Sequence, residues 1–176
     1  MQMRTMILAI LTACLILAGV GSVSAEERAY IPVMVRIPQM IIMKLDATEL
    51  VFNEVDFDYV LGTAHLTKVG VIATKERAVT ATIAGNVPYT LYVSAPEEYF
   101  VGASGGLIHI SQLRWRLTDH SETDSWESVS LERVPVQSGP PGKMEVIFDF
   151  QMTAYWENPA QVYTGQILFT VIPDEV

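Results

Sequence analysis

Apolar and polar residues alternate along most of this sequence, and this pattern restricts the fold more than any other feature. A period of two places successive side chains on opposite faces of a β-strand, whereas an amphipathic helix needs a period near 3.6. Residues 79–83 and 89–93 alternate most regularly, and residues 144–154 form the longest run. With a turn every ten residues or so, the pattern predicts an all-β chain of roughly eight to ten short strands.

The predicted strands have one apolar and one polar face, which is typical of antiparallel sheets with one face exposed to solvent. Two such sheets packed face to face would bury every apolar face, so we expect an antiparallel β-sandwich. Residues 77–95 predict a hairpin that turns at Gly85 and Asn86. The last strand is expected to pair with the strand 144–156, with its aliphatic and aromatic residues pointing inward: Ile167, Phe169 and Val171.

Residues 1–25 have the segment order of a secretory signal peptide. Arg4 precedes an apolar run over 5–21, small residues follow, and charge begins only at Glu26. We therefore expect an N-terminal signal helix that is cleaved after Ala25, one β-sandwich domain over 26–176, and export to the periplasm, the cell surface or the exterior. The alternative is an uncleaved membrane anchor, for which the apolar run is a little short.

Cys14 is the only cysteine of the chain and lies in the apolar run. The stretch LTAC, residues 11–14, spells a bacterial lipobox, which would attach lipid to Cys14 and tether the protein to a membrane. The residues after Cys14 stay strongly apolar, which is unusual for the start of a mature lipoprotein, so we favour an ordinary signal core. The mature chain would then have no disulfide and no thiol chemistry.

The formal net charge of -9 excludes one class of partner. A nucleic-acid-binding surface needs clustered lysine and arginine, and no basic cluster occurs. The acidity fits an extracellular surface, or one that collects divalent cations.

Two stretches resemble bacterial secreted immunoglobulin-like β-sandwich modules. In the closing stretch 158–173 the matching positions are Pro159, Ala160, Tyr163, Gly165, Thr170 and Val171, with Gln161 in place of the usual glycine. Residues 86–95, NVPYTLYVSA, resemble another strand of these modules, and LRWRL with Trp126 downstream is similar to them too. The resemblance implies an immunoglobulin-like fold related to surface-coat, WxL-like or pilus-associated domains, and Tyr163 resembles the tyrosine corner of such sandwiches.

Residues 102–106, GASGG, spell the G-x-S-x-G motif that presents a nucleophilic serine in hydrolases. That motif needs a strand before it and a helix after it, whereas residues 107–117 alternate like a strand. His109 or His120 could act as a base for Ser104. Because the α/β context is missing, we interpret the motif as a glycine loop and expect that the protein is not an enzyme.

Asp119, Glu122 and Asp124 gather carboxylates within one polar loop. Hard cations such as Ca²⁺ prefer several oxygen ligands at such spacing, although the EF-hand pattern is absent. The alternative is a solvated acidic loop. His65, His109 and His120 lie far apart and lack zinc-site spacing.

Tyr92 and Tyr155 fall on the outward faces of their predicted strands, where they could stack sugar rings. Packing within the core or at an edge is the alternative reading for large aromatics. Trp115 is in register with Leu113 and Leu117, so we expect it in the core.

Residues 29–38, AYIPVMVRIP, could add a strand to the sheet edge of another subunit, or form the first strand of their own domain. The leading hypothesis is a non-enzymatic structural or adhesive module of the bacterial cell envelope or exterior, which contacts itself or another surface protein. The alternative hypothesis is a carbohydrate-binding module that uses exposed aromatics, with Ca²⁺ as a candidate cofactor.

Overall fold

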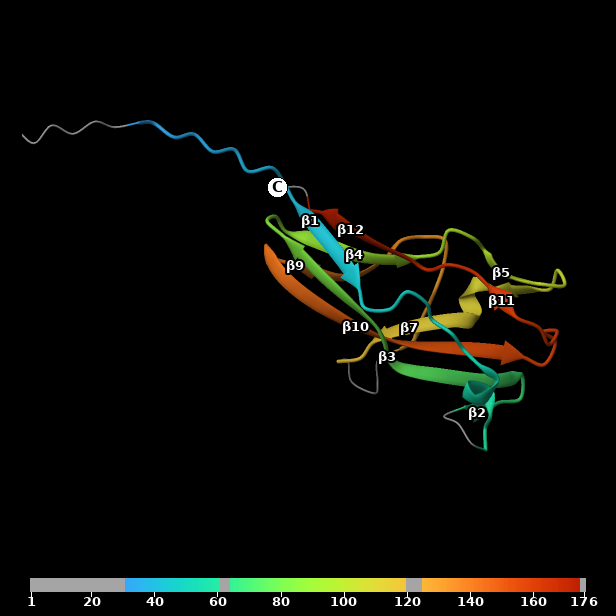
Figure 1. Cartoon of the computed structure of the whole chain (residues 1–176). Coiled ribbons are helices and arrows are strands. Elements are labelled where there is room, and N and C mark those ends of the chain that lie inside the picture. Colours follow the sequence, from blue (N-terminus) through green and yellow to red (C-terminus); the bar gives the residue numbers. More distant parts are fainter. Residues whose placement is uncertain (1–30, 61–63, 120–124, 175–176) are drawn as a thin grey trace, which may run out of the picture. The chain divides into compact units, whose positions relative to one another are not determined.

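The computed structural model describes residues 31–60, 64–119 and 125–174. It divides into two units, Met1–Ile37 and Pro38–Val176. The described residues of the first unit, 31–37, form no helix or strand and are exposed. All of the described strands belong to the second unit (Figure 1). The predicted signal segment, its helix and Cys14 lie outside the described residues.

The largest sheet contains six strands, and every pairing in it is antiparallel. Its path runs through β1 (Ile41–Leu45), β3 (Gly70–Gly85), β10 (Gly142–Tyr155), β7 (Leu113–Leu117) and β8 (Glu127–Ser128), and β2 (His65–Leu66) pairs with β3 beside this path. The long strands β3 and β10 form the centre of the sheet.

Two three-stranded antiparallel sheets complete the unit. One has the order β12 (Leu168–Pro173), β4 (Tyr89–Ser94) and β9 (Val134–Gly139), and the other has the order β11 (Tyr163–Thr164), β5 (Tyr99–Gly102) and β6 (Leu107–His109). The helical elements of the described residues are two short 3-10 turns, η1 (Glu54–Phe57) and η2 (Ile110–Gln112). The expectation of an all-β chain with antiparallel sheets is confirmed. The described part holds twelve strands, three of them with only two residues, so the expected number of strands is not confirmed.

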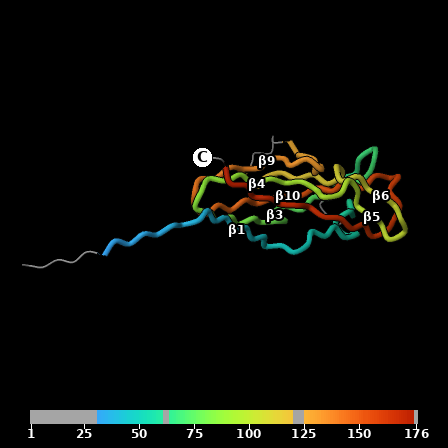
Figure 2. Tube along the Cα trace, turned by 90° about the horizontal axis from the view of Figure 1, so that it is seen from above, coloured from blue at the N-terminus to red at the C-terminus, as the bar shows by residue number. Residues whose placement is uncertain are grey.

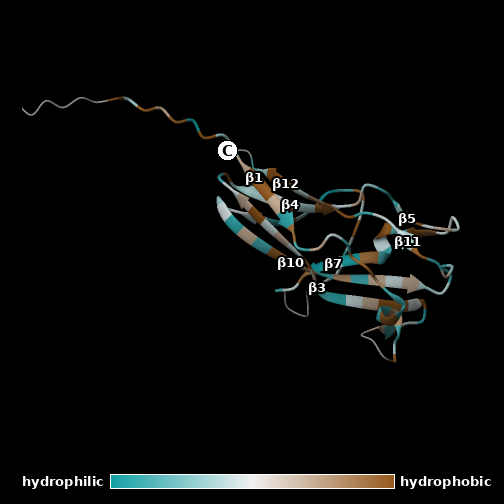
Figure 3. Cartoon of the chain, viewed as in Figure 1, coloured by the Kyte–Doolittle hydropathy of each residue, from teal (hydrophilic) through white to brown (hydrophobic). Residues whose placement is uncertain are grey.

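One apolar core lies between the six-stranded sheet and the sheet β12-β4-β9. It combines alternate residues of β3, β10 and β7 with alternate residues of β4, among them Ile83, Phe148, Trp115 and Leu91. Figure 2 shows β4 and β9 as a layer over β3 and β10, with β5 and β6 at one end of the unit. Figure 3 shows the alternation as brown and teal bands along β3 and β10. Burying each such large side chain contributes about 1.5–3 kcal/mol to stability.

Contacts across the two layers confirm two predicted inward faces. The ring of Phe148 on β10 lies 5.2 Å from the ring of Phe169 on β12, measured between centroids. Ile167 and Val171 also pack against the core, and Trp115 is buried as expected.

Two predicted strand pairings are wrong. The predicted hairpin does not form, because β3 pairs with β1, β2 and β10, whereas β4 pairs with β9 and β12. The turn after Gly85 carries the chain from one layer to the other, so the two apolar faces oppose each other across the core. The last strand likewise pairs with β4 rather than with residues 144–156. Alternation identifies a strand and its buried face, but it does not identify the neighbouring strand.

An irregularity interrupts the ladder between β3 and β10. Phe148 lies opposite Val79 and Phe150 opposite Lys75, so residues 76–78 bulge where β10 supplies only Asp149. Arg77, in the middle of this bulge, has a φ of 50°, which is left-handed and uncommon for a residue other than glycine. The bulge determines the polar surroundings of Asp149.

Candidate functional site

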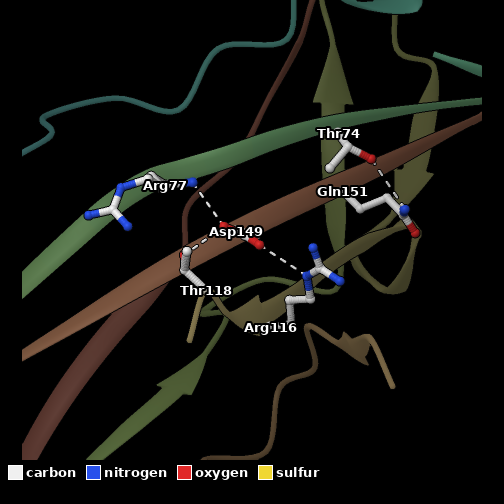
Figure 4. A network of polar contacts seen from close by, with 6 residues as sticks. All are labelled: Thr74, Arg77, Arg116, Thr118, Asp149 and Gln151. Carbon is white, nitrogen blue, oxygen red and sulfur yellow. Dashed lines mark hydrogen bonds and ion pairs between the residues drawn. The ribbon is translucent and has the colours of Figure 1, made fainter. Parts of the chain in front are cut away.

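Asp149 is the most buried charged residue of the described chain, with 2% of its surface exposed. Its Oδ1 accepts hydrogen bonds from the backbone N–H of Arg77 at 2.8 Å and from the Thr118 hydroxyl at 2.6 Å (Figure 4). Its Oδ2 accepts one from Arg116 Nε at 3.0 Å. The carboxylate therefore joins β3, β7 and β10 at the bulge, where the regular ladder is interrupted.

The protonation of Asp149 follows from this geometry. Burial by itself would raise the pKa of the carboxyl group, but the hydrogen bonds from Thr118, the Arg77 backbone and Arg116, with the charge of Arg116, lower it below its usual range. Asp149 is therefore ionised at neutral pH. Since its oxygens already accept three hydrogen bonds, it anchors Arg116 and the bulge and is not placed to exchange protons with a substrate.

A shallow hollow lies beside this anchor on the outer face of the six-stranded sheet. The guanidinium carbon of Arg116 lies 4.6 Å from the centre of the Trp126 ring, so Trp126, Arg116 and Asp149 form successive layers. Gln151 Nε2 donates to the Thr74 hydroxyl at 3.3 Å. The hollow has a volume of about 470 Å³ and is lined by Ala64, His65, Thr74, Glu76, Arg116, Trp126 and Gln151. We call these residues the outer hollow.

The two predicted sugar-stacking tyrosines do not form one platform. Tyr92 lies on β4 and Tyr155 at the end of β10, and both are half-buried. These strands belong to different sheets, and alternation directs the two side chains to the outer faces of opposite layers. Each tyrosine remains a separate candidate.

The predicted cation site lies mostly outside the described residues. Asp119 is exposed just after β7, whereas Glu122 and Asp124 are not among the residues that the structure describes. Within 31–60, 64–119 and 125–174, no three or more His, Cys, Asp or Glu side chains gather into a group that could hold a metal ion. A Ca²⁺ site in this loop stays a prediction.

The GASGG stretch forms a turn after β5 that receives the side chain of Gln161. The backbone N–H of Ser104 donates to Gln161 Oε1 at 2.8 Å. A Cβ atom on Gly102 or Gly106 would overlap the end of the Gln161 side chain, which would then have to move aside. Gln161, which replaces a glycine in the motif described above, thus occupies the space that both glycines leave.

Ser104 has no histidine base in the described part of the chain. His109 Nδ1 lies 2.7 Å from the Ser111 hydroxyl, and its Nε2 lies 3.5 Å from Glu98 Oε1. His120 lies outside the described residues. This arrangement does not support the hydrolase interpretation of the motif.

The closing motif also contains a tyrosine that bonds back to the chain. The Tyr163 hydroxyl donates to the carbonyl of Pro159, four residues upstream, at 2.8 Å. Gly165 lies against the ring of Phe100, where a Cβ atom would overlap the ring. Both contacts fix the path of residues 159–165 against β5.

The segment that precedes β1 exposes apolar side chains. Ile31, Val33, Met34, Val35 and Ile37 are each between 72% and 86% exposed. Asn86 holds the chain where it enters β1: its Nδ2 donates to the Pro38 carbonyl and its Oδ1 accepts from Met40 N–H, both at 2.8 Å. Asn86, which the sequence predicts as part of a hairpin turn, therefore fixes the residues just before β1.

Sequence reasoning missed Asp149, Arg116 and Trp126 as a group. The local sequence does contain one signal, because Lys75 and Arg77 occupy the same parity as the buried residues Ala73 and Val79. Two charged residues at inward positions indicate an irregular strand. What the sequence does not show is that Asp149, more than seventy residues away, accepts the freed N–H of Arg77.

Comparisons with known proteins were made for the whole chain. No protein family and no curated protein matches it. One solved structure that resembles it is a family 123 glycoside hydrolase from Clostridium perfringens, studied for glycolipid glycan hydrolysis, at 11% identity and a TM-score of 0.42. The match covers 77% of this chain but only 25% of that enzyme, and so weak a likeness carries no argument about function. Among the described residues, no helix has the length and apolarity that a membrane span requires.

Proposed function

We propose that this chain is a non-enzymatic structural module of the bacterial cell envelope or exterior, and that it works through contacts between copies of itself. The observation that carries this proposal is the high exposure of individual apolar side chains within residues 31–42. We call these residues the N-terminal segment. Seven of its apolar side chains are each more than half exposed: Ile31, Val33, Met34, Val35, Ile37, Met40 and Ile42.

Exposed apolar side chains in such number are typical of interaction sites, because each large aliphatic side chain gains about 1.5–3 kcal/mol when it is buried. The alternating pattern of residues 33–37 suits a strand that adds to a sheet edge. The segment includes the first two residues of β1, which ends the strand order of the six-stranded sheet and so has one edge without a strand partner in the described residues. An exposed strand edge favours edge-to-edge pairing with another chain.

Charge favours a second copy as the partner. Arg36 is the only charged residue of 31–37, while the chain as a whole carries a net charge of -9. A segment that is apolar and basic therefore meets an acidic surface on another copy, and complementary charge speeds and orients such contacts.

The immunoglobulin-like sandwich is part of the same proposal. Two antiparallel sheets that share one core support it, and so does the Tyr163 hydroxyl, which bonds upstream as in a tyrosine corner. A likeness to surface-coat, WxL-like or pilus-associated modules, and export by the segment 1–25, complete the proposed setting.

Size-exclusion chromatography with light scattering on Glu26–Val176 tests the proposal. We expect assembly that increases with concentration, and a monomer when Ile31, Val33, Val35 and Ile37 are all changed to Ser. A matched control changes Val101 and Leu107 to Ser; these cross-strand partners on β5 and β6 are also more than half exposed and lie outside the segment, so this variant should assemble normally. A monomer at every concentration, or assembly that survives the four substitutions, contradicts the proposal.

A further inference from the structure

The outer hollow combines the aromatic ring of Trp126 with polar side chains that are held in place by hydrogen bonds. We propose that it binds a neutral sugar unit of a glycan. This inference is independent of the contacts proposed for the N-terminal segment, because the two surfaces share no residue.

The first argument is rigidity. Arg116 Nε donates to Asp149 Oδ2 at 3.0 Å, and the guanidinium carbon of Arg116 lies 4.6 Å from the centre of the Trp126 ring. The Arg116 and Trp126 side chains are therefore held in place before a ligand binds. Figure 4 shows the two terminal nitrogens of Arg116 directed away from Asp149. Groups fixed in advance lose little conformational entropy on binding, which raises affinity.

The second argument is the kind of hydrogen bond that the hollow offers. Gln151 provides both a carbonyl and an amide, His65 provides two ring nitrogens, and Glu76 provides two carboxylate oxygens. Sugar hydroxyls both donate and accept, so they can satisfy such a mixed set. The carboxylate of Glu76 disfavours an anion, and Arg116 disfavours a cation, which leaves a neutral ligand.

The third argument is the aromatic wall and the size of the hollow. Arg116 covers one face of the Trp126 indole, and the opposite face can attract the weakly positive C–H groups on one side of a pyranose ring, as an indole attracts cations. The volume of about 470 Å³ lies within the range of small-molecule sites, roughly 300–1,000 Å³. A hollow that is open on a sheet face suits one unit of a longer chain of sugars.

Tryptophan fluorescence tests this directly, because the chain has three tryptophans in different surroundings. Trp115 is buried, Trp126 lines the outer hollow and Trp156 is exposed elsewhere. In a Trp156→Phe background of Glu26–Val176, emission changes report on Trp126. The probes are glucose, galactose, mannose, N-acetylglucosamine, and the disaccharides lactose, maltose and chitobiose, with inorganic phosphate and calcium chloride as charged probes.

We expect a saturable change with at least one sugar and none with phosphate or calcium. Gln151→Ala and Glu76→Ala should each weaken binding about ten-fold, because a sugar hydroxyl loses its partner. The control Thr82→Ala lies on β3 of the same sheet, outside the hollow, and should bind like the parent. Calorimetry with Trp126→Ala, in the otherwise unchanged chain, should detect no binding.

Three results would overturn the inference: no saturable response to any sugar, a response to phosphate or calcium alone, or unchanged affinity in both Gln151→Ala and Glu76→Ala. Circular dichroism of each variant shows that it is folded. Since the readout is sugar affinity and not oligomeric state, failure here leaves the proposed self-contact untouched.

Discussion

Strand β4 and residues 31–37 share an alternating apolar pattern but have opposite surroundings. Leu91 and Val93 of β4 are 0% and 1% exposed, whereas Val33 and Val35 are 82% and 74% exposed. Both stretches alternate, and both are rich in aliphatic residues. Alternation therefore predicts a tendency to form a strand, but burial depends on whether a second layer lies opposite. β4 has such a layer in its own domain, and we propose that residues 31–37 find theirs in another copy.

The largest expected difference between the two regions concerns stability. Phe148→Ala removes a fully buried ring that contacts Trp115 and Phe169, and should lower the free energy of unfolding by about 3–5 kcal/mol. Val35→Ala should change it by less than about 0.5 kcal/mol, because that side chain is exposed. Urea unfolding at a concentration where the chain is monomeric measures both. Similar losses in the two variants would show that residues 31–37 belong to the same core.

Asp149 tests whether the bulge of β3 belongs to the stable region. Asp149→Ala leaves Arg116, Thr118 and the Arg77 N–H without their acceptor, and should destabilise the unit by about 3 kcal/mol. Thermal unfolding measures the change. The control Glu145→Ala removes another carboxylate of β10, which is exposed and pairs with Lys143 two residues away on the same strand, and should be nearly neutral. Equal effects would refute the anchoring role.

The same carboxylate predicts a pH dependence. Its pKa is lowered in the folded state, so the unfolded chain, with a pKa of about 3.9, takes up the proton first as the pH falls. The stabilisation is complete above that unfolded value and is lost as the pH falls through the folded pKa. Asp149→Asn should therefore flatten the acid side of a plot of stability against pH. If the loss of stability at low pH is unchanged in this variant, the pH dependence comes from other carboxyl groups.

A smaller effect is expected at the loop between β5 and β6. Gly106→Ala places a Cβ atom against the end of the Gln161 side chain, which must move aside and lose its hydrogen bond from the Ser104 N–H, at a cost of about 1 kcal/mol. In a Gln161→Ala background the same substitution should cost little, since the space is already empty. A double-mutant cycle measured by urea unfolding gives the coupling between the two positions. Additive losses would mean that the two side chains do not compete for this space.

Particular residues show how far the sequence predicts the structure. Alternation predicts correctly that Trp115 lies in the core and that Phe169 points inward. It does not predict the partners of β4 and β12, because pairing depends on which faces meet across the core and is not encoded in any one strand. The outer hollow could not be predicted, since it unites residues of β2, β3, β7 and β10 with Trp126. It also depends on the bulge of β3, where Asp149 binds both the Arg77 N–H and Arg116.

Hydrogen exchange on Glu26–Val176 at low and high protein concentration tests the central contrast most directly. The account predicts that amides of β3, β4 and β10 are protected at both concentrations, as expected for core strands. Amides of residues 31–37 should exchange rapidly in the dilute sample and become protected in the concentrated one. Protection of residues 31–37 in both samples, or rapid exchange in both, would contradict the proposal that this segment is covered by a second copy of the chain.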